Sequence, residues 1–411
     1  MRHITIIGAG QAGLLLAIGL IARGYLVTLV SDRTPEEILR GPAPAGSVVF
    51  HDALEFEREL GISFWDDVAT MAEAVHLDVA APHGGIGLSI EARLSHPGLC
   101  VDQRLKSARW IEVFVQRGGR FVVKAVTVSD LEAYARESDL VVVATGRGEI
   151  SRLFPKDEAR SPFREAPRHI SMVMLRALPA FANFKTPGVK LRILPGAGEI
   201  FSAPMYARDQ VQIGFVGLEA IPSGPMDRFV AGMHPEAQLE LFKEVFRELV
   251  PWDYEGIRGA ALGEDRAYVF GPIVPTVRRP WGALPSGAVV MGIADTVNLQ
   301  DPIAAQGANN AAKMARLYRE RIAAHGDRPF DTAWMEAVFE EAWDFLRYGN
   351  LLAERLLQPP APHAMEILGA ASQSPAVASR LINGFNHPPS LFPWFEDPVE
   401  ARRFLASAMS A

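Results

Sequence analysis

The sequence GAGQAG at residues 8–13 decides the fold of this chain. It directly follows a short apolar run rich in β-branched residues, Ile4–Ile7. A helical pattern over Leu14–Ile21 and a second apolar run over Leu26–Val30 come next. The order strand, glycine-rich turn, helix, strand predicts a βαβ unit of the dinucleotide-binding type. The motif leaves one alternative open, a glycine-rich turn in an unrelated α/β protein.

Each position of this motif has a role in the predicted unit. Gly8 permits the tight turn, Gly10 lets the backbone approach a pyrophosphate, and Gly13 allows the helix to pack closely on the strand. Gln11 and Ala12 open the helix, whose first N–H groups face the anion. The glycines therefore predict where the phosphates of a dinucleotide bind.

Two polar residues end the second predicted strand. Ser31 and Asp32 follow the apolar run, and Asp32 lies 19 residues after Gly13, where an acidic side chain can accept hydrogen bonds from a ribose. Arg33 and Arg40 are candidates for contact with the adenosine or the pyrophosphate, or else ordinary surface arginines. The motif does not distinguish FAD from NAD.

Two later segments favour a flavin. DLVVVATG at 139–146 predicts a buried strand whose end, Thr145 and Gly146, passes close to the same nucleotide, although a core strand with a turn glycine explains it as well. A second apolar strand, Ala288–Ile293, runs into Asp295, which can bind ribityl hydroxyls. The purely structural alternative for this segment is a strand–loop–helix connection with an Asp cap.

The loop and helix start after Asp295 complete the predicted flavin site. A proline-held loop leads to glycine-opened amides, and a helical pattern covers Ala311–Ile322. Reduced flavin is readily anionic around N1, and a helix N-terminus supplies about half a positive charge without a titratable side chain. The predicted flavin-contacting residues of this segment are Pro302, Gln306, Gly307, Ala308 and Asn309, and the backbone amides from Gly307 to Asn309 can face N1 and the C2 carbonyl.

Composition excludes several classes of protein. The chain has 411 residues, 49% of them hydrophobic, which is enough for large cores and two or three units. Its 41 basic and 48 acidic residues form no basic patch, so nucleic acid and anionic membranes are not expected partners. No apolar run of about 20 residues predicts a membrane span. The single cysteine, Cys100, favours a reducing compartment, with the cytoplasm as the default.

Motifs of other enzyme classes are missing from the sequence. The ten histidines include no HExxH or other close ligand pair, so no metal site is expected. There is no GxSxG motif of a serine hydrolase and no WxWxIP segment of the flavin-dependent halogenase type.

The remaining segments predict a second sheet and a helical tail. Residues 74–100 and 166–270 alternate β-rich stretches, such as Arg192–Leu194 and Gln212–Val216, with turn residues, as an antiparallel sheet covering a pocket does. The tail from about residue 330 is helical and broken by prolines. The expected fold class is therefore α/β, a Rossmann-like FAD-binding domain with an inserted antiparallel substrate domain and a helical C-terminal region. The expected boundaries are 1–73, 101–165 and 271–330 for the FAD-binding domain, 74–100 and 166–270 for the substrate domain, and 331–411 for the helical region.

Taken in order, the motifs resemble one family over nearly the full chain. The pattern is similar to the flavoprotein component of styrene and indole monooxygenases, a branch of the group with the hydroxybenzoate hydroxylase fold. The matching motifs are GAGQAG at 8–13, SDRTP at 31–35, VDQR at 101–104, RGGRF at 117–121, DLVVVATG at 139–146, DPIAAQGAN at 301–309, SQSP at 372–375 and GFNHP at 384–388.

The resemblance implies a two-component system. A separate NADH-dependent flavin reductase delivers reduced FAD, which the chain binds and which reacts with O2. The resulting C4a-hydroperoxyflavin passes one oxygen atom to an electron-rich alkene such as indole or styrene and gives an epoxide. Such chemistry requires a dry pocket and a held flavin rather than a protein nucleophile or a metal. A homodimer is a further family expectation.

The resemblance also suggests individual residues. Arg104 of VDQR matches a family arginine expected near the FAD, or else is an ordinary surface arginine. His51, in a half-buried strand, either lines the pocket beside the flavin or is merely hydrogen-bonded. The expected substrate wall consists of Val49, Phe201, Pro204, Met205, Tyr206 and Pro302, although core packing explains the aromatic and apolar ones nearly as well.

One loop departs from the family pattern. Residues 40–49 have a length closer to the indole type, but their side chains match neither the styrene nor the indole fingerprint. Styrene-type enzymes carry an asparagine in this loop, and an ungapped register from His51 puts Ser47 there. Ser47 is therefore the expected residue facing the reacting ring, and an aryl alkene, an indole derivative or a sulfide remain alternatives as substrate.

Two other functions stay open from the sequence. One is a single-component aromatic hydroxylase that binds NAD(P)H itself. The other is a flavin-binding carrier or sensor that no longer oxygenates.

Overall fold

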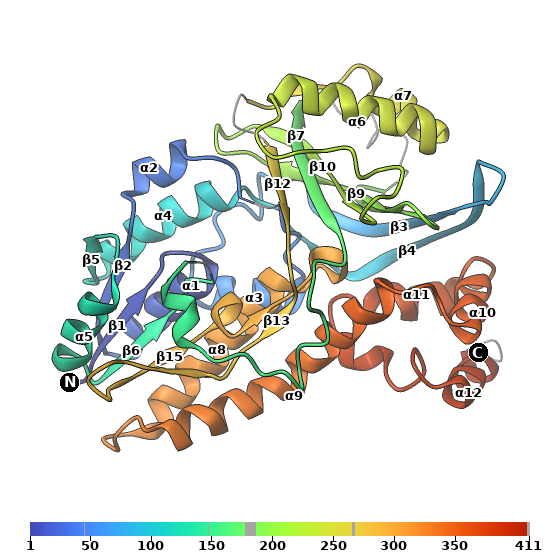
Figure 1. Ribbon diagram of the computed structural model, residues 1–411. Coiled ribbons are helices and arrows are strands. Elements are labelled where there is room, and N and C mark those ends of the chain that lie inside the picture. The colour runs from blue at the N-terminus through green and yellow to red at the C-terminus, as the bar shows by residue number, and fades with distance from the viewer. Residues whose placement is uncertain (45, 147, 177–185, 265–267, 409–411) are drawn as a thin grey trace.

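Two large β-sheets organise the structure, a computed structural model that describes residues 1–44, 46–146, 148–176, 186–264 and 268–408 (Figure 1). The first sheet has six strands in the order β14-β15-β6-β1-β2-β5. Their bounds are β1 His3–Ile7, β2 Leu26–Ser31, β5 Arg120–Val123, β6 Leu140–Val143, β14 Trp281–Ala283 and β15 Val289–Gly292. All neighbours pair in parallel except β14, which runs antiparallel to β15.

Helices cover the first sheet, which explains why its strands are apolar on both faces. Helices α1 Gln11–Ile21, α4 Gln103–Gln116 and α5 Val128–Glu137 contact its strands. Helix α8, Gly307–His325, packs on α1, while α2, Pro35–Arg40, packs on α4, and α3, His51–Glu59, packs on α8. Helix α1 contacts the sheet, α4 and α8, and nine of its eleven residues are buried. The predicted βαβ unit is confirmed, and α1 begins at Gln11 immediately after the glycine turn.

The second sheet has eight strands, in the order β11-β7-β10-β9-β8-β3-β4 with β12 also paired to β7. Their bounds are β3 Ala72–Ala80, β4 Ile86–Gly98, β7 His169–Arg176, β8 Gly188–Leu194, β9 Gly198–Tyr206, β10 Gln212–Ala220, β11 Ala261–Leu262 and β12 Tyr268–Pro272. The expected antiparallel pairing has one exception, because β3 and β8 pair in parallel. No hairpin joins these two strands, which lie on either side of a long stretch of the first unit, so antiparallel pairing is not imposed on them.

Two groups of helices cover the second sheet. Helices α6, Pro235–Leu249, and α7, Tyr254–Arg258, pack on one face, while α10 Pro362–Ala371, α11 Pro375–Asn383 and α12 Pro398–Ala408 lie toward β3 and β4 (Figure 1). The long helix α9, Thr332–Leu356, connects them to α8. Among the described residues no helix has the length and apolar character of a membrane span.

The segment between β12 and α8 contains short elements that prepare the site. Strands β13, Thr276–Val277, and β16, Asn298–Leu299, form a two-stranded sheet. Two 3-10 turns, Ala294–Thr296 and Pro302–Ala304, lead into α8, which begins at Gly307 rather than at Ala311. The α/β fold class with its antiparallel-rich second sheet and C-terminal helices is confirmed, whereas the exact domain boundaries remain a prediction.

Candidate functional site

The carboxyl edge of the first sheet brings the predicted cofactor segments together. Gly8, with a φ of +115°, turns the chain after β1, and a Cβ there would lie 2.7 Å from the carbonyl oxygen of Ala144 at the end of β6. A Cβ on Gly13 would lie 2.0 Å from the carbonyl oxygen of Gly8, so the helix packs directly on the turn. Gly146 meets Asp295 in the same way, with 2.5 Å between a Cβ on Gly146 and the Asp295 Cβ. Glycine at these positions lets the ends of β1, β6 and β15 converge.

Two other glycines leave open space. Gly10, immediately before α1, and Gly307, the first residue of α8, would each place a Cβ with no atom within 4 Å. The two helix starts lie side by side, because the Gln11 Nε2 atom donates to the Ala308 carbonyl oxygen at 3.2 Å. Segments from the two ends of the predicted site are thus in direct contact.

Neither helix start is capped by the protein. Within the described part of the chain, the N-cap residues Gly10 and Gln306 make no side-chain cap hydrogen bond, and neither first turn contains an acidic residue. Helix α2 contrasts with them, because Thr34 and Glu37 form a complete capping box at its start. The first N–H groups of a helix have no intrahelical acceptor, so α1 and α8 offer unpaired donors that favour anions.

Orphaned polar atoms support the same interpretation. The Thr145 Oγ1 atom and the Gln306 Oε1 atom are buried without a hydrogen-bond partner in the described part of the chain. Thr145 follows β6 and Gln306 immediately precedes α8. Together with the open space at Gly10 and Gly307, these donors and acceptors fit a dinucleotide that spans both helix starts, as FAD does.

The turn before α8 is held rigidly. The Asp301 Oδ1 atom accepts from the Ile303 N–H at 3.1 Å, and the Ala305 N–H donates to the Pro302 carbonyl oxygen at 2.7 Å. Ala305 has a left-handed backbone with a φ of 53°. Gln306 Nε2 donates to the carbonyl oxygen of Ala304 at 3.0 Å. The position of Gly307 is therefore fixed by the turn that precedes it.

Asn309 uses its side chain to hold a loop. Its Oδ1 atom accepts from the Phe50 N–H at 2.7 Å, and its Nδ2 atom donates to the Val48 carbonyl oxygen at 3.0 Å. Ser47 precedes this loop segment, and its hydroxyl accepts from Gln103 Nε2 at 3.2 Å. The structure thus places Ser47 in a loop anchored to the first turn of α8.

His51 and Val49 have different surroundings. His51 is the first residue of α3, so the expected half-buried strand is wrong there, and its ring stacks on His96 with 3.9 Å between centroids. The extended residues before His51 resemble a strand in sequence, and a single residue at a helix start does not reveal where the helix begins. Val49 is buried and exchanges backbone hydrogen bonds with Leu99 in both directions, at 2.8 and 2.9 Å.

The predicted substrate wall divides between two faces of the second sheet. Successive residues of a strand point to opposite faces, so Phe201 and Met205 share one face of β9, and Pro204 and Tyr206 share the other. The Phe201 ring lies 6.0 Å from that of Phe215 in an edge-on arrangement. This face carries the loop of residues 46–50, because the Gly46 N–H approaches the Met172 sulfur at 3.2 Å.

Arg104 is committed to protein partners. It is buried, its Nη2 atom lies 2.6 Å from Asp102, and its Nη1 atom donates to the Gly41 carbonyl oxygen at 2.9 Å and pairs with Glu264 at 2.5 Å. The guanidinium therefore anchors the loop after α2 to the second sheet. The expected position of Arg104 near FAD stays a prediction.

The residues predicted to bind the adenosine half lie at the end of β2. Ser31 is buried, whereas the Asp32 side chain is 64% exposed and 3.4 Å from the Arg33 guanidinium. Asp32 is thus accessible to a ribose. Arg40 lies at the end of α2, largely exposed, and pairs with Glu36 at 2.9 Å.

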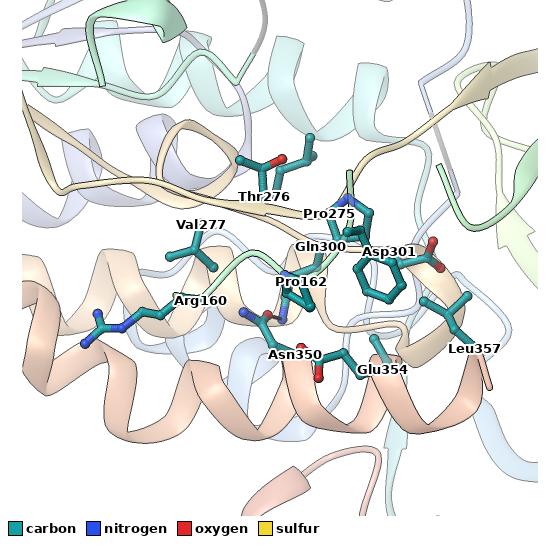
Figure 2. Close-up of a pocket in the computed structure, with 13 residues that line it drawn as sticks. Arg160, Pro162, Pro275, Thr276, Val277, Gln300, Asp301, Asn350, Glu354 and Leu357 are labelled. Carbon is teal, nitrogen blue, oxygen red and sulfur yellow. Dashed lines mark hydrogen bonds between the residues drawn. The ribbon is translucent and has the colours of Figure 1, made fainter. Parts of the chain in front are cut away.

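The sequence analysis missed a buried acidic pair beside Pro302. Glu219, near the end of β10, contacts Asp301, and both carboxyl groups are buried. A pocket adjoins the turn, lined among others by Asp301, Gln300, Asn350 and Glu354 (Figure 2). An acidic residue at the end of the apolar run QIGFVGLEA is the sequence signal that could have indicated the pair.

Comparisons with known proteins agree with this geometry. The family model described as "Styrene monooxygenase A putative substrate binding domain" matches residues 146–256. Two proteins named styrene monooxygenase StyA, one from Pseudomonas sp and one from Pseudomonas fluorescens, are each 26% identical to the chain. Each alignment covers 97% of this chain and 96% of the relative.

Solved structures share the fold at lower identity. The flavin-dependent brominase Bmp2 is 14% identical with a TM-score of 0.69 and 99% coverage of both chains. The flavin-dependent halogenase CmlS is 13% identical with a TM-score of 0.67, covering 100% of this chain and 77% of that one. At these identities the likeness concerns the fold alone.

Proposed function

We propose that the chain is a member of the styrene monooxygenase A family and acts as the oxygenase component of a two-component FAD-dependent monooxygenase. In this proposal an NADH-dependent flavin reductase supplies reduced FAD, and the substrate is a small aryl alkene such as styrene or indole. One atom of O2 enters the epoxide and the other leaves as water, while FADH2 is oxidised to FAD. Bound reduced FAD supplies the two electrons and the centre at which O2 is activated.

The observation that carries the proposal is the contact between the starts of α1 and α8. Gln11 reaches the Ala308 carbonyl oxygen, and both helix starts are free of capping side chains and acidic residues. One elongated dianionic cofactor can therefore use both sets of N–H groups, with its pyrophosphate at α1 and its ring at α8. A mononucleotide would leave one of the two helix starts without an anion.

Individual residues take defined tasks in this arrangement. The N–H groups after Gly10 bind the pyrophosphate, and Asp32 accepts hydrogen bonds from the adenosine ribose. Asp295 accepts from ribityl hydroxyls next to Gly146, with which it is in contact. The N–H groups of Gly307 and the two residues after it stabilise negative charge on the reduced ring without a titratable side chain.

The substrate is proposed to bind between the ring and the apolar face of β9. Phe201 and Met205 contribute to this face, and the loop containing Ser47 packs over it through Gly46. A largely apolar wall excludes water from the reacting centre and protects it from hydrolytic side reactions. The side chain of Ser47 is proposed to contribute to substrate choice.

The test is a reconstitution with photoreduced FAD. The purified chain, loaded with photoreduced FAD and mixed with O2 and styrene or indole, should release the corresponding epoxide or its rearrangement product. Oxidised FAD and NADH without any reductase should leave the flavin absorbance unchanged. Rapid bleaching in that control would favour a single-component hydroxylase, and tight FAD binding without product from any aryl alkene would favour a carrier.

A further inference from the structure

Two carboxyl groups face each other at the junction of the second sheet and the turn before α8. Glu219 is 0% exposed and Asp301 is 1% exposed. Both oxygens of Glu219 and the Oδ2 atom of Asp301 meet no N–H or O–H donor among the described residues. The two carboxyl groups are each other's partners. Two ionised carboxylates are both acceptors and cannot hydrogen-bond each other, so the contact requires a proton on one of them.

The surroundings assign that proton to Glu219. Burial raises the pKa of Glu219 well above its ordinary value, and the charge of Asp301 raises this pKa further. Burial also raises the pKa of Asp301, but the Ile303 N–H and the charge of Arg168 favour its ionised form. Glu219 is therefore the donor and Asp301 the acceptor.

The other charged groups around the pair do not replace this proton. The positive charge that acts on both carboxyl groups is that of Arg168, which is held by Glu199 on β9 at 2.8 and 3.0 Å and by the carbonyl oxygen of Leu357 at 3.2 Å. Glu199 is directly opposite Glu219 in the sheet, so it adds negative charge. Asp301 lines the pocket of Figure 2.

We propose that Glu219 is a positioning residue whose protonated carboxyl group holds Asp301, and with it the turn that sets the start of α8. The proposal rests on the proposed function, because the start of α8 is where the reduced flavin ring would bind. Asp301 caps the 3-10 turn Pro302–Ala304, which continues through Ala305 into Gln306 and the helix. When the proton is lost at higher pH, two buried carboxylates repel each other and the turn shifts away from β10.

The first test needs no flavin. Glu219→Gln keeps a neutral donor of similar shape but cannot ionise. In the full-length protein, the infrared C=O band of a protonated carboxylic acid should persist at pH values at which ordinary carboxyl groups are ionised. Glu219→Gln should remove this band. A folded-state pKa that is raised stabilises the protein below the ordinary carboxyl pKa, and this stability is lost as the pH rises toward the raised value. The free energy of unfolding of Glu219→Gln should lack that loss.

The second test measures affinity for reduced FAD under anaerobic conditions. Wild-type affinity should fall with rising pH more steeply than that of Glu219→Gln. Glu219→Leu, which removes the donor, should bind about tenfold more weakly than Glu219→Gln at neutral pH, as expected for a lost hydrogen bond to a charged group. The ionisation of the flavin itself is common to all variants and cancels in these comparisons.

Glu354→Gln is the matched control. Glu354 lines the same pocket from α9, and burial raises its pKa, but the charges acting on it are those of Arg355 and Glu396. This variant should alter the pH dependence of unfolding and leave that of reduced-FAD binding as in the wild type.

The outcomes separate the two proposals. An unchanged infrared band, or identical pH dependence of FAD affinity in wild type and Glu219→Gln, would overturn the role of Glu219. A chain that binds no FAD in either redox state would refute the proposed function, while the infrared and unfolding measurements would still decide whether Glu219 holds the proton.

Discussion

Replacing Gly307 by valine should weaken binding of reduced FAD more than binding of oxidised FAD, with little effect on folding. A Cβ at this position would meet no atom within 4 Å, so the protein itself has room for a side chain. Valine is better than glycine in a helix by only a few tenths of a kcal/mol. The free energy of unfolding of the flavin-free protein should therefore change by less than about 0.5 kcal/mol.

The magnitude follows from the charge on the bound ring. A hydrogen bond from a backbone N–H to a charged acceptor contributes about 1.5–3 kcal/mol, and one to a neutral acceptor about 0.5–1.5 kcal/mol. If the valine side chain moves the ring edge out of reach, reduced FAD loses about 1 kcal/mol more than oxidised FAD. This difference is about fivefold in the ratio of the two dissociation constants. It also lowers the two-electron potential of the bound flavin by about 20 mV.

Anaerobic fluorescence titrations with oxidised and photoreduced FAD measure both constants. Gly369→Val in α10 is the matched control, since Gly369 is also helical and a Cβ there would also meet nothing within 4 Å. The control should bind both forms like the wild type. Equal losses for both redox states in Gly307→Val, or a similar loss in Gly369→Val, would refute the reasoning.

Three further predictions test other parts of the site. Gly10→Ala should fold normally yet bind both redox states of FAD more weakly. In contrast, Gly13→Ala should lose about 2 kcal/mol or more of unfolding free energy in urea titrations, because its Cβ would lie 2.0 Å from the Gly8 carbonyl oxygen. Asn309→Leu leaves the Phe50 N–H and the Val48 carbonyl oxygen without their partner and should lower the free energy of unfolding by about 2–4 kcal/mol. Faster proteolysis of this loop is the measurement. Burial raises the pKa of the Cys100 thiol to about 12, so it should resist a thiol reagent at about pH 8 until guanidinium unfolds the protein.

The parts of the fold that the sequence predicts are those with local causes. Apolar runs bounded by glycine define β1, α1 and β2, because strand and helix periodicity is a property of neighbouring residues. The helical pattern predicts α8 only from Ala311 onward, whereas the helix begins at Gly307, because glycine and asparagine are poor helix formers. Tertiary contacts of Asn309 and Gln306 fix that first turn despite the propensity.

The parallel pairing of β3 with β8 and the Glu219–Asp301 pair have distant causes. Each joins two segments that are far apart in the sequence. An acidic residue at the end of an apolar strand indicates only that it has a partner. Which partner it has is a property of the packed structure.

Asn309 was predicted as a backbone donor, and its side chain has a second task that no motif indicates. Its amide binds the loop of residues 48–50 in two directions, while its own N–H belongs to the first turn of α8. The loop after Ser47 and the proposed flavin-ring site are therefore joined through one residue.

The substrate sheet thus meets the start of α8 through polar contacts as well as apolar ones. The loop of residues 46–50 lies on the β9 face and is bound by Asn309, and β10 reaches the preceding turn through Glu219 and Asp301. Apolar contacts are non-directional, whereas hydrogen bonds between buried groups require a defined distance and angle, and a buried group that loses its partner costs about 1–3 kcal/mol. Substitutions on the sheet that change substrate choice should therefore also change how the chain binds reduced FAD. Binding of substrate and binding of flavin are then coupled. By linkage, bound substrate must change the affinity for flavin by the same factor as bound flavin changes the affinity for substrate.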